Sequence, residues 1–194
     1  MTRIAFALFA LATSTSVAAF AEEHPKSPRG QSATEVGGKW IEVNYGRPVL
    51  RGRQNFFGAG PTYGKEANGG APVWRAGANE TSRLKTEVPL RFGDKVVAPG
   101  SYDLFVELKD GAWTLVLSTQ PALEVGGKKD KSKLWGAYGY DPKFDVVRVP
   151  MTLSKSEASI DQFTIAFVDI TSKSGKLELA WEHTVATATF GIGG

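Results

Sequence analysis

Apolar and polar residues alternate along much of the chain, and the alternation is clearest between residues 101 and 118. Ser101 to Lys109 (SYDLFVELK) alternates, Asp110-Gly111 follows, and Ala112 to Ser118 (AWTLVLS) alternates again. Two alternating segments joined by Asp-Gly are typical of a β-hairpin, because both positions of that turn tolerate a positive φ. The pattern therefore predicts a two-stranded antiparallel unit with one apolar face.

The remaining segments extend this prediction to a whole domain. Extended or alternating stretches occur at Trp40 to Tyr45, Leu84 to Phe92, Asp145 to Leu153, Asp161 to Ile170 and Lys176 to Phe190. No segment offers an amphipathic helix of three turns. The fold class expected is all-β: a single antiparallel β-sandwich, jelly-roll-like or Greek-key, with few or no helices beyond the signal peptide. One core is expected to contain Tyr102, Leu104, Val106, Trp113, Leu115, Phe163, Ile165, Phe167, Leu177, Leu179 and Trp181.

The N-terminal residues have the pattern of a secretory signal. Arg3 precedes the apolar run Ile4 to Ala12, and Ala19-Phe20-Ala21 offers a small-x-small cleavage site. A membrane anchor would need about 20 apolar residues, but Thr13 to Ser16 interrupts the run. We therefore expect a signal peptide over residues 1–21, a flexible leader over 22–38 and the β-sandwich domain over 39–192. This predicts a periplasmic or secreted bacterial protein with no membrane span in its mature form.

The composition of the chain excludes several kinds of catalytic and metal-binding site. The 194 residues include no cysteine, which excludes thiolate catalysis, disulfides and cysteine-ligated metals. The net charge is +3, and the one basic run, Lys128 to Lys133, is expected to be a solvated loop, so a nucleic-acid partner is not predicted. The glycine-rich residues 58–70 lack the Lys-Ser/Thr ending of a P-loop, and no calcium-loop spacing occurs. No cofactor or metal is expected.

The segment Pro72 to Glu80 (PVWRAGANE) is the strongest candidate for a site. It places Trp74, Arg75, Asn79 and Glu80 among small residues and follows neither helical nor strand periodicity. Aromatic faces with guanidinium and amide donors are typical of sites for sugar rings and carboxylated molecules. The candidate ligand-binding residues are Arg47, Trp74, Arg75, Asn79, Glu80, Trp135 and Tyr138. The competing interpretation is structural, with the tryptophans in the core and the arginines bracing loops.

Catalysis has weaker support. Only two histidines exist, and His183 follows Trp181 on the apolar side of the last strand, which predicts a buried or half-buried structural histidine. No GxSxG nucleophile motif is present. Glu80 remains a candidate acid, with Asp141 or Asp145 as a second carboxylate. Alternatively, Glu80 forms a structural ion pair with Arg75 or with one of Arg47, Arg51 and Arg53.

Several short motifs follow one another along the chain. They are Gly46-Arg47-Pro48, Arg51-Gly52-Arg53, Val73 to Glu80 (VWRAGANE), Pro99 to Tyr102 (PGSY), Trp135 to Tyr138 (WGAY) and Val146 to Val149 (VVRV). Taken together and in this order, they resemble the DUF2911 family of exported bacterial proteins of unknown function. The resemblance covers roughly residues 40–190 and implies an exported, β-rich domain, without an established activity. The loop at residues 123–133 departs from it, being longer and more basic than expected.

Three functions are consistent with these patterns. The first is a binding module that holds a glycan or a small anionic ligand in a Trp/Arg/Asn/Glu pocket. The second is a metal-independent glycan hydrolase that uses Glu80 as its acid. The third is a structural component of an envelope assembly, for which the leader and the Lys-rich loop would supply contacts. Neither the ligand nor the oligomeric state follows from the sequence.

Overall fold

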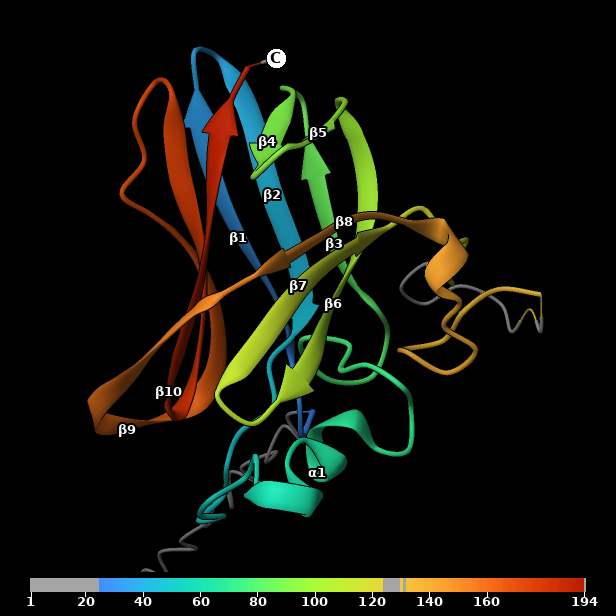
Figure 1. Ribbon diagram of the computed structural model, residues 1–194, viewed down its shortest axis with the longest axis vertical. Helices are drawn as coiled ribbons and strands as arrows, with labels where there is room; N and C mark the ends of the chain where they lie inside the picture. The colour runs from blue at the N-terminus through green and yellow to red at the C-terminus, as the bar shows by residue number, and fades with distance from the viewer. Residues whose placement is uncertain (1–24, 124–129, 131, 194) are drawn as a thin grey trace, which may run out of the picture.

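The computed structural model describes residues 25–123, 130 and 132–193, and it forms two packed antiparallel β-sheets (Figure 1). The expected signal peptide, residues 1–21, and most of the basic loop lie outside the described residues. One sheet has the strand order β1 (Arg29–Val36), β2 (Lys39–Gly46), β3 (Ser82–Thr86), β6 (Gly100–Lys109), β7 (Ala112–Ser118) and β8 (Asp145–Pro150). The other has the order β5 (Lys95–Val97), β4 (Leu90–Phe92), β10 (Ser174–Ile192) and β9 (Thr152–Val168). The predicted all-β sandwich is confirmed.

The predicted hairpin is present as β6 and β7. Leu104 pairs with Leu117 and Lys109 with Ala112, so that Asp110 and Gly111 form the turn. Nine of the eleven expected core residues are buried, and the other two, Tyr102 and Phe167, are partly buried and pack against the core. Alternation identified these strands because one face packs in the main core, whereas the other face mixes polar residues with Phe105 and Val116, which are buried in a second, smaller cluster.

The prediction of a flexible leader over residues 22–38 is wrong for its second half. Arg29–Val36 forms β1, which pairs with β2 along its whole length from Arg29↔Gly46 to Val36↔Lys39. Gly37 and Gly38, both with positive φ, make the turn between the two strands. As an edge strand β1 has only half-buried and exposed residues, so its sequence lacks the apolar period by which inner strands are identified.

The expected burial of His183 is also wrong. Extra residues in β9 shift its register against β10 between Ala180 and Thr184, and Glu182 within this irregular stretch has a φ of 55°. Register irregularities of this kind re-aim the side chains of a strand. The buried positions of β10 change from Leu177, Leu179 and Trp181 to Ala186, Ala188 and Phe190. His183 lies in the shifted stretch and is exposed, with Nδ1 2.9 Å from the carbonyl oxygen of Ser156.

Residues 47–81 leave the sheets between β2 and β3 and gather at one end of the sandwich, the lower end in Figure 1. They contain two short helices, η1 (Gly60–Thr62) and α1 (Lys65–Asn68), and a third, η2 (Pro142–Phe144), precedes β8. The segment is anchored where the backbones of Trp74 and Val106 exchange two hydrogen bonds of 2.8 Å. None of the helices in the described part of the chain is long and apolar enough to cross a membrane.

Candidate functional site

Trp74 lies at the centre of an aromatic cluster at this end of the sandwich. Its side chain is 1% exposed and stacks on Trp181, with ring centroids 6.2 Å apart and planes 9° apart. Phe163 packs against it at 4.9 Å in an edge-to-face contact. Trp74 is therefore a core residue as well as part of a cavity wall. Within the described residues, its indole N–H finds no hydrogen-bond partner.

The small residues after Arg75 allow two backbone segments to touch. A Cβ on Gly46 would lie 2.1 Å from the Ala78 carbonyl oxygen, and a Cβ on Gly77 would lie 2.7 Å from the Gly46 carbonyl oxygen. Ala76 and Asn79 have φ values of 44° and 63°, a left-handed conformation that is strained for alanine. Such strain persists only where the surrounding structure imposes it, and it concentrates at ligand clamps and active sites.

Arg75 is a buried cation that has no anion beside it among the described residues. Its exposure is 9%, and its Nη1 donates a 3.0 Å hydrogen bond to the carbonyl oxygen of Asn79. Its Cζ lies 5.4 Å from the ring centre of Trp135 and 5.1 Å from that of Tyr138. No described carboxylate forms an ion pair with Arg75, and its Nε and Nη2 donate no hydrogen bond to the described residues. Buried charges are normally paired, so this arrangement calls for an explanation.

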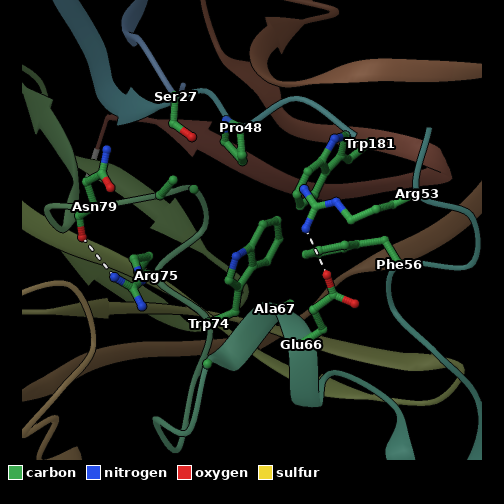
Figure 2. A pocket seen from close by; sticks show the side chains of 13 residues that line it. Ser27, Pro48, Arg53, Phe56, Glu66, Ala67, Trp74, Arg75, Asn79 and Trp181 are labelled. Carbon is green, nitrogen blue, oxygen red and sulfur yellow. Dashed lines mark hydrogen bonds and ion pairs between the residues drawn. The ribbon is translucent and has the colours of Figure 1, made fainter. Parts of the chain in front are cut away.

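Arg75 lines a cavity of about 310 Å³ at the end of the sandwich (Figure 2). In this view the indole of Trp74 lies between Arg75 with Asn79 on one side and Arg53 with Glu66 on the other, and the indole of Trp181 lies beside Arg53. The whole lining consists of Ser27, Pro48, Arg53, Phe56, Glu66, Ala67, Gly69, Trp74, Arg75, Gly77, Ala78, Asn79 and Trp181.

The guanidinium of Arg53, unlike that of Arg75, forms an ion pair within the described part of the protein. Its Nη1 forms a 2.8 Å ion pair with Oε1 of Glu66, and its Nε donates to the carbonyl oxygen of Leu50 at 2.9 Å. Its guanidinium also lies over the ring of Phe56, with Cζ 4.7 Å from the centroid. Among the described residues, Arg53 is therefore paired with a carboxylate and Arg75 is not, and Arg75 is the more deeply buried of the two.

Glu80 does not join this cavity. Its carboxylate lies 3.6 Å from Arg29, which corrects the expected pairing with Arg75, Arg47, Arg51 or Arg53. Burial lowers the pKa of Arg29, and the nearby Glu80 carboxylate acts in the opposite direction. The sequence could not indicate this partner, because Arg29 lies in the strand that was expected to be a flexible leader.

The carboxylates considered as partners of Glu80 are also engaged elsewhere. Asp141 binds Lys143 at 2.6 Å, and Asp145 binds Arg148 at 2.8 Å. Among the residues described here, no group of three or more histidine and acidic side chains is close enough to hold a metal ion. The arrangement of charges at the cavity therefore suits binding of an anion better than acid–base chemistry.

The other expected site residues lie around the cavity without lining it. Trp135 and Tyr138 stack on each other with centroids 5.8 Å apart, are each 44% exposed, and cover Arg75 from a separate loop. The Tyr138 hydroxyl donates to the Gly69 carbonyl oxygen at 2.8 Å, which ties this loop to α1. Arg47 instead packs its side chain against Gly30 of β1, and its Nε is buried without a hydrogen-bond partner among the residues that the structure describes.

Sequence reasoning missed several lining residues. Arg53 and Phe56 were overlooked because they belong to a glycine-rich loop without periodicity, and Trp181 was expected only in the core. Ser27 comes from the segment before β1. The one available signal was composition, since Arg53 and Phe56 bring a cation and an aromatic ring into a loop otherwise rich in glycine.

A family model described as "Protein of unknown function (DUF2911)" matches residues 27–190. No curated protein and no solved structure matches the chain. The match begins two residues before β1 and ends within β10, so it spans both sheets and every residue that lines the cavity.

Proposed function

We propose that this chain, which belongs to the DUF2911 family of proteins of unknown function, is an exported binding domain that holds the anionic group of a small organic ligand on Arg75. The observation that carries the proposal is the charge state of the cavity. Arg75 is nine-tenths buried, lines the cavity and has no ion-pair partner among the described residues. A carboxylate or phosphate oxygen would supply that partner.

The geometry favours a planar carboxylate. A guanidinium binds a carboxylate through two parallel N–H donors. Nη1 of Arg75 donates to the Asn79 carbonyl oxygen, whereas Nε and Nη2 donate no hydrogen bond to the described residues and can bind a ligand. The indole of Trp74 offers a further N–H donor in the same lining. The aromatic walls supply apolar contact to the rest of the ligand. The cavity, at about 310 Å³, is at the small end of the range for small-molecule sites.

The test is a thermal-unfolding screen of the purified protein with matched pairs of small molecules. Each carboxylate, such as galacturonate or benzoate, is compared with a neutral counterpart, galactose or benzamide. A ligand that binds only the native state raises the midpoint in proportion to ln(1 + [L]/Kd), so carboxylates should raise it and neutral counterparts should not. If every pair gives equal shifts, or none shifts the midpoint, the proposal is wrong.

A glycine substitution tests whether the position of Arg75 matters. Gly136 has a φ of 63°, and a Cβ there would lie 2.5 Å from Nη1 of Arg75. Gly136→Ala should therefore displace the guanidinium and abolish the stabilisation by carboxylates. The left-handed backbone should cost about 1–2 kcal/mol of unfolding free energy as well.

Gly139→Ala is the matched control in the same loop. Gly139 has a φ of 83°, but a Cβ there would have no heavy atom within 4 Å. Denaturant unfolding should show a similar loss of stability for both variants, whereas only Gly136→Ala should lose the response to carboxylates. Equal responses of the two variants to carboxylates would contradict the assigned role of Arg75.

A further inference from the structure

A second cavity adjoins the first one across Arg53. It has a volume of about 650 Å³, and Arg53 lines both cavities. Residues that are adjacent in the sequence line different cavities. Phe56 and Trp181 line the first cavity, whereas their neighbours Asn55 and Glu182 line the second. The full lining of the second cavity is Arg53, Gln54, Asn55, Lys155, Ser159, Glu182, His183 and Thr184. Together the two cavities offer space for an elongated ligand.

The second cavity differs from the first in its chemistry. Its lining has amide, hydroxyl, ammonium, guanidinium, carboxylate and imidazole groups and no tryptophan, tyrosine or phenylalanine. His183 Nδ1 lies 2.9 Å from the Ser156 carbonyl oxygen, which can only accept, so Nδ1 is the donor of this hydrogen bond. The side chain of Lys155 forms no hydrogen bond or ion pair within the described residues. Donors and acceptors of this kind match the hydroxyl groups of sugars.

Backbone strain marks both cavities. Three of the six described non-glycine residues with positive φ line them: Asn79 in the first, and Asn55 and Glu182 in the second. Glu182 Oε2 accepts a 3.1 Å hydrogen bond from the backbone nitrogen of Phe56, which fixes the loop of the first cavity to the strand of the second. The wall shared by the two cavities is thus held in a fixed shape, as sites that recognise a defined ligand require.

We propose that the ligand is an acidic oligosaccharide. This inference rests on the proposed function: the carboxylate of one uronic acid unit binds Arg75, and the next sugar units pass Arg53 and place their hydroxyl groups in the second cavity. The mixed donors and acceptors of the second lining favour the hydroxyl groups of sugar units. These features favour a glycan over an acidic peptide.

Calorimetric titration tests this inference with three ligands: galacturonate, tetragalacturonate and tetraglutamate. Tetragalacturonate should bind at least about tenfold more tightly than galacturonate, as expected for a few added hydrogen bonds. The double variant N55G/K155A, in which glycine retains the positive φ, should lose that gain and keep the affinity for galacturonate. Arg75→Gln should lose both ligands. Lys85→Ala, which replaces an exposed lysine outside both linings, is the control and should lose neither.

Each failure has a distinct meaning. Equal affinities for galacturonate and tetragalacturonate, or an unchanged tetragalacturonate affinity in N55G/K155A, would overturn the second-cavity inference and leave the proposed function intact. Tighter binding of tetraglutamate than of tetragalacturonate would overturn the choice of a glycan. If neither uronate binds, this inference fails, while the proposed function is still judged by the non-sugar carboxylates of the thermal screen.

Discussion

Arg75→Gln is expected to lower the affinity for a carboxylate ligand by at least about 30-fold. Truncating one partner of a buried, hydrogen-bonded charge pair costs about 2 kcal/mol or more, and 1.4 kcal/mol corresponds to a factor of ten. The stability of the unliganded protein should change by no more than about 2 kcal/mol, because the variant loses one hydrogen bond to Asn79 and the contacts of the cation with Trp135 and Tyr138, and it leaves no described carboxylate unpaired. Calorimetric titration and denaturant unfolding measure the two quantities.

Two comparisons make this prediction decisive. Arg91→Gln, at an exposed arginine of β4, should change neither binding nor stability. A purely structural Arg75 gives the opposite pattern, with about 3–5 kcal/mol lost from the unfolding free energy, as occurs when a buried ion pair is broken. Such a loss in Arg75→Gln, together with unchanged carboxylate affinity, would contradict the proposed function.

Phe163→Ala is expected to have the largest effect on stability, about 3–5 kcal/mol. Phe163 is fully buried and contacts Tyr45 at 5.7 Å, Trp74 at 4.9 Å and Trp181 at 5.7 Å between ring centroids. Removing its ring would leave a void beneath the cavity that the surrounding rings cannot close. Chemical denaturation of the variant and the parent protein measures the difference.

Phe167→Ala is the matched control four residues along the same strand. Phe167 is only partly buried and makes its ring contact with Phe190 at 6.2 Å, away from the aromatic cluster. Its loss should be clearly smaller than that of Phe163. Equal losses for the two variants would contradict the assignment of the core to the Trp74 cluster.

The strands that the sequence predicted best are those with two unlike faces. In the hairpin of β6 and β7, buried Leu104 and Val106 alternate with side chains that face away from the main core, so a period of two is visible. The edge strand β1 has no buried residue, so nothing distinguished it from a flexible leader. The register irregularity near Glu182 likewise leaves no pattern in the sequence that could predict it. It changes which alternate residues of β10 are buried.

The candidate site was partly predictable for a similar reason. Local composition identified Trp74, Arg75 and Asn79, which the chain itself brings together within six residues and which line one cavity. The partner of Glu80 was not predictable, because the choice among many arginines depends on the pairing of β1. That same choice leaves Arg75 without a carboxylate from the described part of the chain, and this is the feature on which the proposed function depends.

The most direct test of the central claim is a crystal structure of the protein with the carboxylate that gives the largest shift in the thermal screen. The account predicts a carboxylate within about 2.7–2.9 Å of the Arg75 guanidinium nitrogens, the distance of a charge-assisted hydrogen bond, with the rest of the ligand against Trp74. A ligand bound elsewhere, or a protein carboxylate found on Arg75 in the complex, would contradict it.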